Sequence, residues 1–221
     1  MIPLKNINIV YGHYGVGKTN FVLNLALDAA DRGEKTTVVD MDVVNPYFRS
    51  GGYSGLLEQR GVELIATQFA NSNLDLPSLP AEMYSIFSKT DRKIIIDVGG
   101  DDAGAFALGR FSAMIKQRDH QAIYLVNRFR ALTHTPQEAA DILSEIEQAS
   151  RIKADCIINN SHLGAYTGEQ EILSGFEFAE QTAALVGLPL IATTCERNLF
   201  DNLIGKIPDL RPIDIIVKPP F

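Results

Sequence analysis

The sequence predicts a three-layer α/β domain in which a mostly parallel central sheet carries helices on both faces. The first observation is a set of short apolar runs rich in valine and isoleucine, which are typical of strands buried on both faces. The second is that helix-length amphipathic stretches separate most of these runs, as the crossovers between parallel strands require. The predicted strands are Ile7–Tyr11, Thr36–Met41, Val62–Ala66, Ile94–Val98, Ala122–Val126, Cys156–Ile158 and Leu188–Ala192.

Three of the intervening stretches carry clear helix signals. Asn20–Arg32 places its apolar residues on one stripe and ends before Gly33, which suits a helix C-terminus. The second helix opens at Thr135, followed by proline at its first position and by a glutamate that completes a capping box, and it runs to about Ser150. The third spans Gly168–Val186 and is closed by glycine and proline. The tail is predicted to be extended or a strand, because its prolines disfavour a helix.

Composition and charge predict one soluble domain that spans residues 1–221. The stretch 71–80, with Asn, Ser, Asp and Pro, is expected to be a surface loop. The net charge of −7 and the small size of the basic cluster Arg128–Arg130 argue against a nucleic-acid partner. No apolar run approaches the ~20 residues that span a bilayer, so we expect a cytoplasmic protein without a membrane partner. The two cysteines, Cys156 and Cys195, belong to no metal-binding motif.

A glycine-rich stretch between the first predicted strand and the first helix carries the strongest functional signal. It reads GHYGVGKT and matches the phosphate-binding pattern G-x-x-x-x-G-K-[ST] in full. Glycines let backbone N–H groups turn inward around phosphate oxygens, beside the positive end of the helix. Lys18 is predicted to reach the β- and γ-phosphates, and the Thr19 hydroxyl to hold Mg²⁺. The predicted nucleotide-binding residues of this stretch are Gly12, His13, Tyr14, Gly15, Val16, Gly17, Lys18, Thr19 and Asn20.

Acidic residues end two other predicted strands. Asp40 and Asp42 end the second strand and point the same way from the pleat, and Asp97 ends the fourth before a Gly-Gly turn. Ligands of open α/β sheets bind at the carboxyl ends of the strands, so these carboxylates are expected beside the phosphates. A capping or turn-forming aspartate is the alternative for each. Together with the glycine-rich loop they favour a P-loop NTPase domain, because phosphoryl transfer is catalysed mainly by positioning and by charge neutralisation.

With those residues in place, the chain resembles the MinD/ParA-like ATPases, a group that includes the nitrogenase iron protein and CooC-type ATPases. The likeness runs over about residues 4–200 and is most specific in the P-loop, in VVDMD and in DVGG. It implies that Asp42 activates the attacking water, that Asp40 supports the metal side and that Asp97 bonds a metal-bound water. The catalytic residues that follow from this resemblance are Asp42, Lys18 and Asp40, and the metal-binding residues are Thr19, Asp42 and Asp97.

The same resemblance implies two residues that read the nucleotide. Gly100 matches the switch glycine that senses the γ-phosphate. The stretch DCIINNSHLG resembles the strand end where an asparagine reads the purine edge, which falls on Asn160 with Asn159 as the near alternative. A turn-forming asparagine is the other interpretation. No N/T-K-x-D guanine motif appears in the sequence, which favours ATP over GTP.

The P-loop departs from the group's signature K-G-G-x-G-K-T at His13 and Tyr14. In the group, the signature lysine reaches across a dimer to the partner's nucleotide, much as an arginine finger does. Imidazole is shorter than lysine and mostly neutral at pH 7. We therefore expect slow hydrolysis within a nucleotide-dependent homodimer, stimulated by a partner protein or by acidification that protonates His13. Arg128 or Arg130 is an alternative source of the missing charge. The other interpretation is that both arginines are simply exposed to solvent.

Three functions are compatible with this sequence. The first is a slow Mg-dependent ATPase that acts as a nucleotide-driven switch on a partner protein. The second is a small-molecule ligase or kinase similar to dethiobiotin synthetase, and the third is a module that binds nucleotide without turnover. A dethiobiotin-synthetase-like enzyme would need a substrate-binding lysine after the second strand, whereas a switch would have a long partner-facing segment after Asp42. We favour the switch, because the sequence after Asp42 fits such a segment better.

Overall fold

Eight parallel strands form one sheet in the computed structural model, which describes residues 2–41, 53–66, 81–100 and 102–217. The strand order is β3-β2-β4-β1-β5-β6-β7-β8. All neighbouring pairs are parallel, which confirms the predicted fold class. The strands are β1 (Ile7–Tyr11), β2 (Thr36–Met41), β3 (Glu63–Ala66), β4 (Lys93–Val98), β5 (His120–Val126), β6 (Cys156–Asn159), β7 (Leu190–Glu196) and β8 (Leu210–Ile213).

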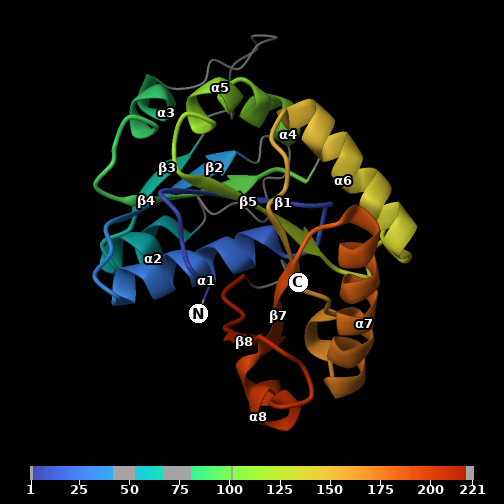
Figure 1. Ribbon diagram of the computed structural model, residues 1–221. Helices are drawn as coiled ribbons and strands as arrows, with labels where there is room; N and C mark the ends of the chain where they lie inside the picture. Colours follow the sequence, from blue (N-terminus) through green and yellow to red (C-terminus); the bar gives the residue numbers. More distant parts are fainter. Residues whose placement is uncertain (1, 42–52, 67–80, 101, 218–221) are drawn as a thin grey trace, which may run out of the picture.

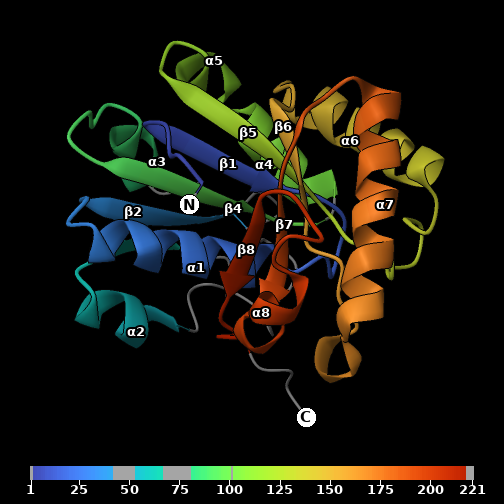
Figure 2. The same ribbon diagram turned by 60° about the horizontal axis from the view of Figure 1, so that its bottom comes forward.

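Helices cover both faces of this sheet (Figure 1). Two of them, α1 and α2, lie on one face, and the group from α3 to α7 covers the other. The short helix α8 contacts β8 at the edge of the sheet (Figure 2). The helices are α1 (Lys18–Asp31), α2 (Ser54–Gln59), α3 (Ala81–Ile86), α4 (Asp102–Gly109), α5 (Ser112–Ile115), α6 (Pro136–Ser150), α7 (Glu169–Val186) and α8 (Phe200–Leu203).

The hydrophobic core of the described residues has two main layers, one on each side of the sheet, and a smaller cluster at the β8 edge. Because successive side chains of a strand point to opposite faces, β1 contributes to both layers. Ile7, Ile9 and Tyr11 pack on the side of α4 to α7, whereas Val10 packs with Phe21 on the α1 side. Every residue of β1 is buried, which explains why the central strands appear in the sequence as continuous apolar runs.

The sequence predicted most element boundaries to within a few residues. The capping box of α6 is confirmed, because the Thr135 hydroxyl accepts from the Glu138 N–H at 3.2 Å and a Glu138 carboxylate oxygen accepts from the Thr135 N–H at 2.9 Å. The prediction for β7 ended too early, at Ala192. The strand continues to Glu196 because its polar second half pairs with β8. Polar residues do not belong to the apolar runs by which buried strands are predicted. The expected loop at 71–80 lies outside the described residues.

The tail after Ile207 was expected to be extended or a strand, and it contains β8. The short helices α2, α3, α4, α5 and α8 were not predicted, because one or two turns of helix give too few residues for a 3.6-residue period to stand out. Among the described helices, none is long and apolar enough to cross a membrane.

Candidate nucleotide-binding site

The loop of residues 12–17 connects the end of β1 to the first turn of α1. Gly17 has a φ of +90° and precedes the helix, and a Cβ at this position would lie 2.5 Å from the Asn160 side-chain nitrogen. Glycine is therefore required there both for its left-handed backbone and for the close approach. Val16 is buried in the α1-side core, while Tyr14 is 55% exposed at the tip of the loop. The loop is thus anchored at its base and open at its tip.

Lys18 lies inside this loop rather than in solvent. Its side chain is buried, and the Nζ atom donates to the backbone carbonyls of Gly12 at 3.0 Å and of His13 at 3.1 Å. Gly100, just after β4, packs against the same place, since a Cβ built on it would lie 2.8 Å from the Lys18 Nζ atom. The same Cβ would lie 2.7 Å from the Tyr14 Cα atom. The structure therefore brings together the predicted phosphate-binding lysine and the predicted γ-phosphate sensor.

The predicted acidic residues lie on adjacent strands. Asp40 of β2 and Asp97 of β4 are register partners, and both are buried. Asp40 is two residues after Val38, and Asp97 is two residues after Ile95, both of which belong to the α1-side core. Both aspartates therefore face the side of the sheet on which α1 lies. Asp42 lies outside the described residues, so its proposed role stays a prediction.

The side chains of the site suit Mg²⁺ that is shared with phosphates and waters better than a metal ion ligated entirely by protein side chains. Within the described ranges, no three His, Cys, Asp or Glu side chains gather into a metal-binding group. Mg²⁺ at a nucleotide site uses only one or two protein oxygens together with phosphates and waters. Thr19, at the start of α1, lines the cavity in front of the loop, and Asp97 ends the strand beside β1. A hydroxyl and a carboxylate are hard oxygen donors, so these two residues fit the ion.

A cavity of about 530 Å³ opens in front of the loop, a volume typical of sites for small ligands and cofactors. The sequence-predicted residues in its lining include Lys18, Thr19, Gly100 and Asn160. Its other walls come from the segments after β5, β6 and β8 and from the end of β7. All of these are carboxyl ends of parallel strands, where ligands bind in open α/β sheets.

Of the two candidate asparagines, Asn160 lines this cavity. Its side-chain nitrogen donates to the Val16 carbonyl at 2.7 Å, and its side-chain oxygen accepts from the Thr194 hydroxyl. Asn159 is buried beside β7, where its side chain contacts the Thr193 hydroxyl at 3.5 Å. The amide of Asn160 therefore connects the loop to β7, and its proposed contact with a purine stays a prediction.

One wall of the cavity was not predicted from the sequence. The strap, defined here as residues 214–217, follows β8 and contributes Ile215 and Val217 to the lining. Asn20 accepts from the backbone N–H groups of residues 216 and 217 at 2.8 and 3.0 Å. Asn24 exchanges two hydrogen bonds with the backbone of Asp214, at 2.9 and 2.8 Å. Two asparagines four residues apart on one helix face were the only signal in the sequence, and no motif marks them.

Two histidines adjoin the loop, and both are biased toward the neutral form. Burial, and then the charge of Arg130, lower the pKa of His162 to about 4. Burial, and then the charge of Lys18, lower the pKa of His13 below its usual 6.5. Charging His13 therefore requires a more acidic solution than a free imidazole needs, which weakens the expectation that mild acidification stimulates the protein.

We expect the free energy of unfolding to fall as the pH is lowered from 6.5 to about 4, in part because of His162. The unfolded chain binds a proton on this histidine over that window, whereas the folded protein excludes it until the pH nears 4. The contribution is at most about 1.4 kcal/mol per pH unit. Denaturant unfolding at several pH values should show a shallower dependence for His162→Gln than for the wild type. His134→Gln, which removes an exposed histidine, is the control, and equal slopes for both variants would contradict the assignment.

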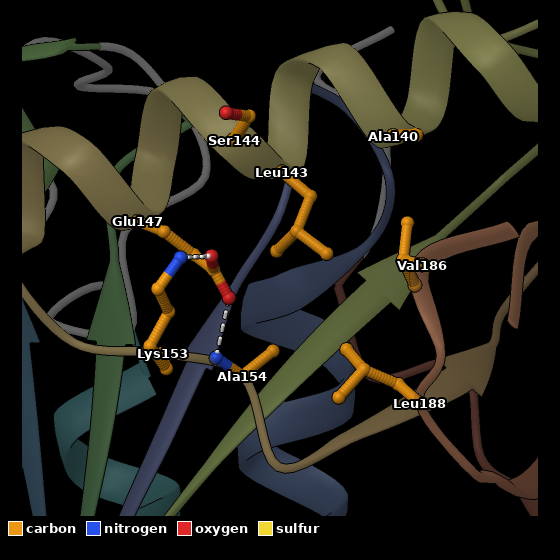
Figure 3. A pocket seen from close by; sticks show the side chains of 8 residues that line it. All are labelled: Ala140, Leu143, Ser144, Glu147, Lys153, Ala154, Val186 and Leu188. Atoms are coloured by element: carbon orange, nitrogen blue, oxygen red, sulfur yellow. Dashed lines mark hydrogen bonds and ion pairs between the residues drawn. The ribbon is translucent and has the colours of Figure 1, made fainter.

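A smaller cavity of about 280 Å³ lies between α6 and the segment that joins α7 to β7 (Figure 3). Its walls are mostly apolar, and the one carboxylate in its lining, Glu147, accepts from Lys153 and from the Ala154 N–H. Ala154 and Leu188 precede β6 and β7, so this cavity is at the amino ends of the strands. Because the loop lies at the opposite ends, we place the nucleotide site in the larger cavity.

The fold and the loop together define a P-loop nucleotide-binding protein. The sequence matches the family model described as the CobQ/CobB/MinD/ParA nucleotide binding domain over residues 7–171. The chain therefore belongs to this family, as its motifs indicated. No curated protein matches the sequence closely enough to count as a relative.

Solved structures with the same fold are distant in sequence. The signal recognition particle 54 kDa protein of Aeropyrum pernix, in complex with GDP, is 17% identical with a TM-score of 0.57, over 87% of this chain and 42% of that one. FtsY of Thermotoga maritima is 16% identical with a TM-score of 0.57, over 95% of this chain and 65% of that one. FtsY of Elizabethkingia anophelis is 17% identical with a TM-score of 0.55, over 89% and 60%. This chain thus spans less than two thirds of each of these proteins, and the likeness shows the fold alone.

Proposed function

We propose that the protein binds Mg·ATP and hydrolyses it slowly, as a nucleotide-driven switch that acts on a partner protein. The observation that carries this proposal is the position of Lys18 and Thr19 at the 530 Å³ cavity, with Gly100 packed against the same loop. A triphosphate offers Lys18 charged acceptors in place of two neutral carbonyls, and charge-assisted hydrogen bonds are about twice as strong as neutral ones.

Each side chain of the site has a proposed task. The loop amides and Lys18 bind the phosphates, and Thr19 and Asp97 hold the magnesium and its waters. Mg²⁺, when bound by these residues, would supply positive charge that neutralises the phosphates. Asp42 orients the attacking water and Asp40 supports it from the neighbouring strand end.

The contact between Gly100 and the loop supports a switch. Gly100 lies so close to Lys18 and Tyr14 that phosphates entering the loop must change this contact. The helix α4 begins only two residues later, at Asp102, and carries Phe106 with 62% of its surface exposed. A displacement at Gly100 therefore moves a helix that presents an apolar side chain to a partner. Ordering of segments by the γ-phosphate is a known mechanism of nucleotide switches.

The choice of ATP over GTP rests on the sequence. GTPases of this broad fold recognise guanine with an N/T-K-x-D motif, whereas residues 159–162, at the end of β6, read N-N-S-H. A GDP-bound structural neighbour makes GTP the competing candidate. Calorimetric titrations with ATP and with GTP, each with Mg²⁺, are the direct comparison.

We expect ATP to bind more tightly than GTP and phosphate release to be slow, on the order of one turnover per minute or less without a stimulating partner. Steady-state phosphate release, with and without candidate small carboxylic acids and amines, separates the three functions. Release that depends strictly on a small substrate would favour the ligase or kinase, and no release with tight binding would favour the binding module. Sedimentation with a non-hydrolysable ATP analogue tests the proposed homodimer.

A further inference from the structure

Two arginines follow β5 within three residues of each other, yet their side chains lie in different surroundings. The guanidinium of Arg128 donates to the Ser174 carbonyl of α7 at 3.0 Å and lies 5.6 Å from the centre of the Phe129 ring. Arg130 instead lines the cavity in front of the loop. The two residues therefore carry the same charge but have different access to a bound nucleotide.

Arg130 lies directly against the phosphate-binding loop. A Cβ built on Gly15 would lie 3.2 Å from the Arg130 Nε atom and 3.4 Å from its Cζ atom. Its backbone is fixed as well, since the Arg130 carbonyl accepts from both the N–H and the hydroxyl of Thr133. The single proton of this hydroxyl is shared with the carbonyl of Asn127, at 2.8 Å. The turn after β5 thus fixes the backbone of Arg130, whose guanidinium lies beside Gly15 in the middle of the loop.

The guanidinium has donor capacity that the protein does not use. The Nε atom is buried, and within the described part of the chain it has no hydrogen-bond partner. A buried donor without a partner is costly, and native proteins usually retain one only for a reason. A planar guanidinium is well matched to phosphate oxygens, and inside a cavity its charge acts over a lower dielectric than in water.

We propose that Arg130 is a phosphate-binding residue that supplies, from within the same chain, positive charge to the polyphosphate held by the loop. This inference rests on the proposed function and deepens it. His13 stands where the resemblance to the MinD/ParA-like ATPases implies a lysine, and burial and the charge of Lys18 lower the pKa of its imidazole, which disfavours a positive charge there. Arg130 approaches the loop from β5 of its own chain, so its contribution needs no second copy of the protein.

The test compares Arg130→Ala and Arg130→Gln with Arg128→Ala, a control that removes the same charge two residues away. Calorimetry with inorganic tripolyphosphate isolates the phosphate contact, and titration with a non-hydrolysable ATP analogue and Mg²⁺ follows. We expect both Arg130 variants to bind each probe about tenfold more weakly, and Arg128→Ala to stay within about twofold of the wild type. Arg130→Gln removes the charge but keeps a long polar side chain, so it provides the same comparison if the alanine variant does not fold.

A readout without nucleotide checks the placement of the charge. The pKa of His162, followed by NMR, should rise in Arg130→Gln and stay at the wild-type value in Arg128→Ala, because removing a nearby cation favours the protonated imidazole. Equal effects of the Arg128 and Arg130 substitutions on tripolyphosphate binding, with Lys18→Ala still weakening that binding strongly, would overturn the role of Arg130. Wild-type binding by Lys18→Ala would instead overturn the proposed function itself.

Discussion

Replacing Lys18 with alanine should weaken ATP binding by about 100-fold. A hydrogen bond to a charged group is worth about 1.5–3 kcal/mol, and each 1.4 kcal/mol is a factor of ten in affinity. Lys18 is the buried cation of the loop, held by the carbonyls of Gly12 and His13 at the place where phosphates are expected. Calorimetry of the wild type and the variant, with ATP and Mg²⁺, measures the loss.

The matched control for this experiment is Lys35→Ala. Lys35 lies just before β2, at the amino end of the sheet, and forms an exposed ion pair with Asp91. Its removal changes the net charge by the same amount but should leave ATP affinity unchanged. Because Lys18 also holds the loop, thermal unfolding of the variant should be compared with that of Lys18→Met, which keeps the length of the side chain. Equal affinity of Lys18→Ala and wild type would show that the loop is not the phosphate site.

Substituting Gly100 with alanine should weaken ATP binding by about 30-fold and leave ADP binding within about threefold of the wild type. The added methyl group would lie 2.7 Å from the Tyr14 Cα atom and 2.8 Å from the Lys18 Nζ atom, so the segment after β4 must move away from the loop. A backbone N–H that can no longer reach the γ-phosphate loses a charge-assisted hydrogen bond, which only the triphosphate provides. Competition between ATP and ADP for the site measures the ratio directly.

Gly55→Ala is the control for the general effect of replacing a glycine. Gly55 is in α2, and a methyl group there would meet no atom within 4 Å. Both nucleotide affinities should therefore match those of the wild type. If Gly100→Ala weakened ATP and ADP equally, Gly100 would shape the loop without sensing the γ-phosphate, and the proposed switch would lose its main structural support.

The fold was predictable because its physical causes are local in the sequence. Strands buried on both faces are rich in apolar residues, as β1 is, and the predicted boundaries of β1 and β2 match the structure. The start of α6 was predictable because the capping box needs only Thr135, Pro136 and Glu138. The second half of β7 was missed since Thr193 and Thr194 are buried but polar, and their hydroxyls are satisfied by contacts that no local pattern reveals.

The features of the site also divide into those that depend on local sequence and those that depend on tertiary packing. The loop and the aspartates at the ends of β2 and β4 were predictable, because each needs one residue type at a fixed place in the chain. The position of Arg130 against Gly15, and the neutral state that burial imposes on His162, depend on how the segments after β5 and β6 pack together. Gly15 and Arg130, for example, are more than a hundred positions apart along the chain. No pattern within one segment encodes a contact of this kind.

The strap has a consequence for how the protein is made. Asn20 and Asn24 bind its backbone, so the wall that contains Ile215 and Val217 exists only when this part of the chain meets α1. Ribosomes synthesise β1, the loop and α1 first and the strap much later, and domains generally fold as units during this process. A nascent chain therefore exposes the phosphate-binding loop while the neighbouring wall is still missing. The complete nucleotide cavity is then assembled late in translation, and a ribosome that stalls before β8 leaves a chain with the motif but without the finished cavity.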